Sequence, residues 1–141
     1  MLFIDFDGVL HPVGGAPGYV LPFEWLPQLM DVMSVAPDVG LVIHSSWTQR
    51  YSLEELCEFL GPLRSRVIGT VGPGPKEDAI LEFLRGRPDI DAWLVIDDCP
   101  AEFSPAFLDS IAVCDPRRGL SDPVVQAQLL GWLTPGAHTT R

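Results

Sequence analysis

The stretch Phe3-Ile4-Asp5-Phe6-Asp7-Gly8-Val9-Leu10 begins as an apolar run and ends in two carboxylates and a glycine. Two later runs have the same form, Leu41-Val42-Ile43-His44-Ser45-Ser46 and Leu94-Val95-Ile96-Asp97-Asp98. Buried parallel strands that deliver polar groups at their carboxyl ends build the active sites of open α/β sheets. Because most of the groups delivered here are carboxylates, the pattern indicates a site for a hard divalent cation such as Mg²⁺.

Strand and helix patterns alternate along the rest of the chain. Apolar runs predict strands over residues 2–6, 40–45, 66–71, 93–96 and 111–114. Helical periodicity marks residues 23–35 and 52–60, the segment after Gly72-Pro73-Gly74-Pro75, and Ser121 to about Leu133. In the second helix, Ser52 and Glu55 form a capping box and Leu53, Leu56, Phe59 and Leu60 are expected to face the core. The alternation predicts one Rossmann-like α/β domain of three layers around a parallel sheet of about five strands.

Size and composition fit a single soluble domain. A chain of 141 residues that is 47% hydrophobic can bury one core, which we expect to span residues 1–133, with a flexible tail over 134–141. The Gly- and Pro-rich stretch 11–22 is predicted to be an irregular loop. No apolar run spans a bilayer and the start lacks a basic leader region, so we expect a cytoplasmic protein without membrane contact. Three widely spaced cysteines indicate neither a disulfide framework nor a structural zinc site.

The net charge of −10 argues against nonspecific binding of nucleic acid, because such binding depends on Lys and Arg that neutralise backbone phosphates. A local basic groove stays possible, so the charge leaves nucleic acid open as a partner. A bound divalent metal would also cancel part of the acidity if the strand-end carboxylates converge.

The Asp5-Phe6-Asp7 pair is the most specific chemical signal. The two-residue period of a strand places both carboxylates on one side, and Gly8 lets the chain turn. A cation would neutralise the pair, leave Asp5 ionised as a nucleophile and allow Asp7 to exchange a proton with a leaving group. The alternative is a pair of acids that cap a helix.

Lys76, Ser45 and Ser46 fit the binding of a phosphoryl group. A cation in the first turn of a helix opposes the helix dipole, so Lys76 is best explained if it faces an anion. Arg64 and Arg66 compete for that role, and a solvent-exposed lysine is the plain alternative. The hydroxyl of Ser45 can hydrogen-bond a transferring phosphoryl oxygen, with Ser46 assisting, although two serines after a strand also make an ordinary turn.

Taken together, these segments resemble the motifs of the haloacid dehalogenase (HAD) superfamily in the right order. Residues 5–10 are similar to its first motif, which implies that Asp5 is the phosphorylated nucleophile, that Asp7 is the general acid and base, and that the Asp7 carbonyl contacts Mg²⁺. Residues 41–45 resemble the second motif, ending in Ser45, and Lys76 resembles the third. Residues 94–103 resemble the fourth motif and a related segment of small C-terminal-domain phosphatases. That likeness implies that Asp98 ligates the metal while Asp97 supports it or orients Lys76.

The resemblance implies a Mg²⁺-dependent phosphohydrolase with an aspartyl-phosphate intermediate. Segments 11–40 and 47–75, where the family can carry a cap domain, are mostly accounted for by helix and short loop, so we expect an enzyme with almost no cap and an open site. An open site favours a phosphate on a macromolecule such as a protein or a nucleic acid end. Residues 43–47 also resemble small HAD domains that occur alone or joined to RNA repair enzymes, a likeness that the net negative charge does not support. A phosphotransferase and a noncatalytic binding scaffold are the alternative functions.

Four other side chains receive an expected role. His11 follows the nucleophile motif and is expected to reach the substrate, and Trp47 is expected to stack on a substrate ring. Ser46 completes this predicted substrate-binding set. His44 is predicted to be an interior histidine with satisfied hydrogen bonds that points away from Ser45.

Overall fold

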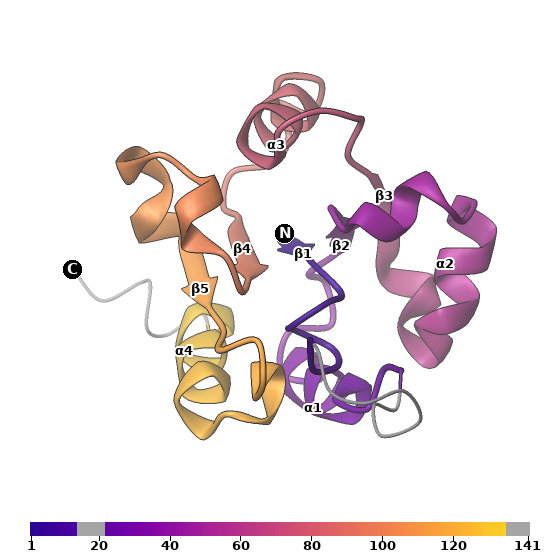
Figure 1. The fold of residues 1–141 in the computed structure, drawn as a ribbon, viewed down its shortest axis with the longest axis vertical. Coiled ribbons are helices and arrows are strands. Elements are labelled where there is room, and N and C mark those ends of the chain that lie inside the picture. The colour runs from indigo at the N-terminus through magenta and orange to yellow at the C-terminus, as the bar shows by residue number, and fades with distance from the viewer. Residues whose placement is uncertain (14–21, 135–141) are drawn as a thin grey trace.

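Five parallel strands form one sheet in the order β3-β2-β1-β4-β5 (Figure 1). The computed structural model describes residues 1–13 and 22–134, so most of the loop predicted over 11–22 and the tail predicted after 133 lie outside the described residues. The strands are β1 (Leu2–Ile4), β2 (Leu41–Ile43), β3 (Val67–Thr70), β4 (Leu94–Asp97) and β5 (Ile111–Val113). The α/β fold expected from the sequence is confirmed.

Helices cover both faces of the sheet and give three layers (Figure 1). The α-helices are α1 (Leu26–Met33), α2 (Leu53–Phe59), α3 (Lys76–Arg85) and α4 (Pro123–Leu133). Short 3₁₀ helices are η1 (Ser46–Gln49), η2 (Gly61–Arg66), η3 (Pro100–Glu102), η4 (Pro105–Ser110) and η5 (Gly119–Ser121). Among the described residues no helix has the length and apolar character needed to cross a bilayer.

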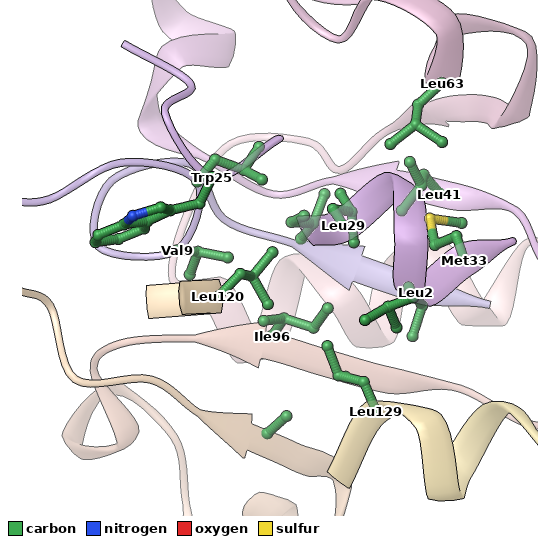
Figure 2. Close-up of a cluster of buried hydrophobic side chains, with 14 of the residues drawn as sticks. Leu2, Val9, Trp25, Leu29, Met33, Leu41, Leu63, Ile96, Leu120 and Leu129 are labelled. Atoms are coloured by element: carbon green, nitrogen blue, oxygen red, sulfur yellow. The ribbon is translucent and has the colours of Figure 1, made fainter. Parts of the chain in front are cut away.

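The period of two along each strand divides the core into two clusters. Leu2 and Ile4 point toward α1, α2 and α4, and Figure 2 shows this side, where Leu2 and Leu41 lie among Leu29, Met33 and Leu129. On the other face, Phe3, Val42 and Val95 pack against α3 and against Phe103 and Phe107. β1, β2 and β4 are buried on both faces, which explains why their sequences begin as continuous apolar runs.

Local signals explain most element ends. The Ser52–Glu55 capping box is formed in both directions at the start of α2, and Asp122 caps α4 through the Val124 amide. β1 and β2 end two residues earlier than predicted, at Ile4 and Ile43, whereas β4 continues one residue further, to Asp97. The prediction that Leu53 faces the core is wrong: it is 46% exposed, because the docked face of α2 is formed by Leu56 and Phe59.

Candidate active site at the carboxyl edge of the sheet

The register of the three central strands brings polar residues together. Ile4 pairs with Ile43 on β2 and with Ile96 on β4, so the next residues in the three strands, Asp5, His44 and Asp97, lie side by side. From β1 the chain adds β2 and β3 on one side of the sheet, and then crosses back to add β4 and β5 on the other side of β1. The direction in which strands are added therefore reverses between β1 and β4. This reversal point is where open α/β sheets bind ligands.

Lys76 joins this group from the start of α3. Its Nζ lies 3.3 Å from Asp5 Oδ2, 2.9 Å from Asp97 Oδ2 and 2.9 Å from Glu102 Oε2. It is the only lysine in the chain. Although burial alone would lower the Lys76 pKa, the surrounding carboxylates, Asp5 first, raise it above its ordinary value, so the ammonium stays charged.

The competing cations are used elsewhere. Arg66 precedes β3 at the opposite, amino edge of the sheet and donates hydrogen bonds to the carbonyls of Met33, Ala36 and Val39. Arg64 is exposed in η2 at the same edge. Neither arginine is placed to face the carboxylates.

Asp97 orients the other groups of the site. Its Oδ1 accepts the Cys99 amide at 2.8 Å, and its Oδ2 accepts His44 Nε2 at 2.8 Å as well as Lys76. Burial opposes ionisation of Asp97, but the hydrogen bond from His44, with help from Lys76, holds its pKa below the ordinary value. Burial lowers the His44 pKa, so this imidazole is neutral and donates through Nε2. Its Nδ1 is buried without a hydrogen-bond partner among the described residues, which differs from the satisfied histidine that the sequence predicts.

Asp5, Asp97 and Asp98 form the group that fits a metal ion, because one oxygen from each lies within 4.8 Å of the others. The close approach of Asp98 depends on Gly8, since a Cβ at that position would lie 2.3 Å from Asp98 Oδ2. Asp97 accepts three hydrogen bonds, two of them on Oδ2, whereas Asp5 accepts one on each oxygen, so Asp97 is less available to a metal ion than Asp5 is. Hard oxygen donors of this kind match Mg²⁺.

An excess of negative charge also favours a cation here. Burial raises the pKa of Asp5 to about 7, with Lys76 opposing the rise and Asp97 adding to it. Burial, then the charge of Asp97, raises the pKa of Asp98 as well. One ammonium therefore faces several carboxylates, and a divalent ion would relieve their repulsion.

Ser45 lies in a pocket beside Lys76. The pocket has a volume of about 680 Å³, and its lining includes His44, Ser45, Ser46, Lys76 and the turn over residues 72–75. Ser45 Oγ accepts the Trp47 amide at 3.2 Å, so its hydroxyl proton remains available to a ligand. Ser46 is exposed and lines both this pocket and a second one of about 490 Å³, and the two pockets also share Gln49.

Asp7 stands apart from the three clustered carboxylates. Its Oδ1 accepts hydrogen bonds from His11 Nε2 at 2.7 Å and from Trp47 Nε1 at 3.1 Å, and it lines the second pocket with Arg50 and Tyr51. His11 is buried and, among the described residues, lines neither pocket, so it reaches the site through Asp7. The Trp47 ring contacts Phe6, His11, Phe23, Tyr51 and Phe59, and the partly buried Trp47 also lines the second pocket.

Sequence reasoning missed Glu102 and Thr70. Glu102 is a third carboxylate on Lys76, and Thr70 ends β3 in the wall of the larger pocket. Glu102 follows the Asp97-Asp98 pair within the same loop, which is the only signal that could have marked it. Thr70 carries no motif of its own.

The sheet and its site define a HAD-like domain. They combine a carboxylate pair after β1, a serine after β2, a lysine at α3 and paired acids at the end of β4. A family model described as the HAD domain in Swiss Army Knife RNA repair proteins matches residues 1–125, and the chain belongs to that family. Membership supports a phosphatase-type hydrolase function in general terms. Comparison with curated proteins and with solved structures finds no significant match. Within residues 1–13 and 22–134, no cap domain interrupts the fold.

Proposed function

We propose that this domain is a Mg²⁺-dependent phosphomonoesterase that works through an aspartyl-phosphate on Asp5. The observation that carries the proposal is the contact of a buried Asp5 with the only lysine of the chain, next to Asp98 and the pocket of Ser45. A carboxylate nucleophile, a fixed cation and a hydroxyl donor are the parts that phosphoryl transfer requires.

The roles follow from the contacts. The Phe6 amide donates to Asp5 Oδ1 at 2.8 Å and fixes the carboxylate, while Lys76 lies near Oδ2. In the first step an Asp5 oxygen forms a bond to phosphorus, the bond from phosphorus to the leaving oxygen breaks, and Asp7 supplies a proton to that oxygen. In the second step water attacks phosphorus, Asp7 takes the water proton, and phosphate leaves Asp5.

Lys76 and Ser45 would hold the phosphoryl oxygens during both steps. Mg²⁺, held by Asp5 and Asp98, would supply positive charge against the charge on the phosphoryl group. Asp97 and His44 keep Lys76 in place but are not assigned contact with the substrate.

The proposed substrate is a phosphate at the end of a polynucleotide. The matched family is described by its occurrence in RNA repair proteins. Two pockets share Ser46 and Gln49 of η1, and Lys76 lines one of them while the predicted acid Asp7 lines the other. Arg50 in the second pocket offers a local positive charge in spite of the net charge of −10. An open site of this kind also admits a large substrate more readily than a sealed one.

The test is hydrolysis of p-nitrophenyl phosphate, with Mg²⁺ and with EDTA. Asp5→Asn should abolish activity, and Asp31→Asn, an exposed acid on α1, is the matched control that should retain it. Activity that requires both Mg²⁺ and Asp5 would support the proposal. A folded wild-type protein that binds no Mg²⁺ and hydrolyses nothing would instead favour the binding scaffold.

The substrate class needs a separate comparison. RNA and DNA oligonucleotides phosphorylated at the 5′ or the 3′ end should be better substrates, by kcat/KM, than a phosphopeptide at equal concentration. A preference for the phosphopeptide would contradict the polynucleotide assignment while leaving the phosphatase chemistry intact. Added alcohols that divert phosphate from water would identify a phosphotransferase.

A further inference from the structure

Two side-chain N–H groups converge on a single oxygen of Asp7. Both His11 Nε2, at 2.7 Å, and Trp47 Nε1, at 3.1 Å, contact Oδ1. No described residue hydrogen-bonds to the other oxygen, Oδ2, and the Asp7 side chain is 47% exposed while that of His11 is 6% exposed. One edge of the carboxylate is therefore fixed and the other is free.

The direction of both bonds follows from the neighbours. The Phe23 amide donates to His11 Nδ1 at 3.2 Å, so Nδ1 is an acceptor and the neutral ring carries its hydrogen on Nε2. An indole nitrogen can only donate. Asp7 Oδ1 thus accepts two hydrogen bonds, which matches a carboxylate whose proton chemistry takes place at Oδ2.

A shell of aromatic rings holds the two donors. Trp47 meets Phe6, Phe23 and Phe59 with ring centroids 5.2 to 5.6 Å apart, and His11 meets Phe23 and Trp47 at 5.3 and 5.4 Å. These rings come from the segments after β1, before α1, in η1 and in α2. Such packing restricts both rings, so the orientation of Asp7 is set before a substrate arrives.

Asp7 lines a pocket that a leaving group can use. Asp7 lines the 490 Å³ pocket with Ser46, Gln49 and Arg50, whereas Lys76 and Ser45 line the larger pocket. The two pockets share Ser46 and Gln49, so a substrate bound across η1 can reach both.

We propose that His11 and Trp47 are positioning residues that hold Asp7 by Oδ1 and leave Oδ2 to protonate the leaving oxygen. This inference rests on the proposed phosphatase function. It assigns both residues to the proton transfers of Asp7, and neither to contact with the reacting atoms. The loss of rate on replacing either residue should therefore be larger for a leaving group that must be protonated.

The test compares leaving groups. The assay compares wild type with His11→Phe, Trp47→Phe and Asp7→Asn on two substrates. The first is p-nitrophenyl phosphate, whose phenolate can leave without being protonated. The second is an alkyl phosphate, whose alkoxide needs a proton to leave. Loss of either donor should lower kcat/KM, which reports the steps up to formation of the aspartyl-phosphate, by about tenfold or more on the alkyl phosphate and by much less on the aryl phosphate. Asp7→Asn should show the same pattern more strongly. His11→Gln, which can restore an N–H donor, should recover part of the loss.

Phe59→Leu is the matched control, because it disturbs the ring shell without removing a hydrogen bond to Asp7. It should change the alkyl and aryl rates by the same factor. If His11→Phe and Trp47→Phe also slow both substrates equally, or slow neither, the positioning role is overturned while activity dependent on Mg²⁺ and Asp5 still supports the phosphatase. A wild type without Mg²⁺-dependent hydrolysis would overturn the proposed function and this inference together.

Discussion

Replacing Asp5 with Asn should stabilise the metal-free protein against unfolding while it removes the proposed nucleophile. Asp5 is 5% exposed and lies among other carboxylates, so its ionised form is held in the fold at a cost. The amide keeps an oxygen that can accept the Phe6 N–H and carries no charge. The expected gain in stability arises because the functional site keeps a buried charge that the fold itself does not need.

The magnitude follows from the Asp5 pKa. Burial raises it from 3.8 to about 7, a shift of roughly three pKa units that corresponds to about 4 kcal/mol. Because the folded pKa lies above the unfolded one, the folded protein binds this proton more tightly and loses stability as pH rises from the unfolded pKa through the folded one. The advantage of the variant should be about 2 kcal/mol near pH 5 and about 4 kcal/mol near pH 8.

The assay is urea unfolding of wild type and Asp5→Asn in EDTA at both pH values, with Asp31→Asn as the control. Taking differences between variants cancels the titration of every group that the substitution leaves undisturbed. Added Mg²⁺ should narrow the gap by binding the folded wild type. A variant that is less stable than wild type near pH 8, or a difference that does not grow with pH, would refute the reasoning.

Three further outcomes are expected. Gly8→Ala should weaken Mg²⁺ binding in calorimetry by about tenfold or more, because its Cβ would displace Asp98, whereas Gly61→Ala, also at positive φ but with open space, should not. Mg²⁺ affinity should be about tenfold higher near pH 8 than near pH 6, because binding must displace the Asp5 proton; a flat profile would contradict the pKa of about 7. Arg50→Gln should lower kcat/KM for phosphorylated oligonucleotides more than for p-nitrophenyl phosphate, with a weaker dependence on salt; equal losses would remove Arg50 from substrate recognition.

The fold could be predicted because its signals are local. Each central strand is a continuous apolar run, and Ser52 with Glu55 marks a helix start that the structure confirms in both hydrogen bonds. Leu53 shows the limit of this reasoning: helical periodicity identifies the docked face of α2 through Leu56, Phe59 and Leu60, but it does not show that this face stops short of Leu53. Strand ends also escaped prediction, because Asp5 follows an apolar run yet lies beyond the last ladder residue.

The site could be predicted only in part, because only some of its residues carry a local signal. Asp5, Lys76, Asp97 and Asp98 each carry a local anomaly, either a charge at the end of an apolar run or a cation at a helix start, and the structure brings them together. The bond from His44 to Asp97 joins residues 53 positions apart, and no pattern within either segment foretells it.

The role of His11 was equally hidden. Its sequence position suggests direct access to the substrate, whereas packing buries the ring and aims Nε2 at Asp7. Trp47 likewise donates its N–H to Asp7 and packs its ring against neighbouring aromatic side chains. Long-range contacts of this kind depend on the crossovers of the chain, and these are set by the whole fold.

The most direct test of the central claim is to trap the phosphorylated protein. Wild type turning over p-nitrophenyl phosphate with Mg²⁺ is quenched in acid, digested and analysed by mass spectrometry, with Asp5→Asn treated in parallel. The account predicts one added phosphoryl group on Asp5 of the wild type and none on the variant. Active wild type that never carries phosphate on Asp5, or a variant that hydrolyses the substrate as fast as wild type, would contradict it.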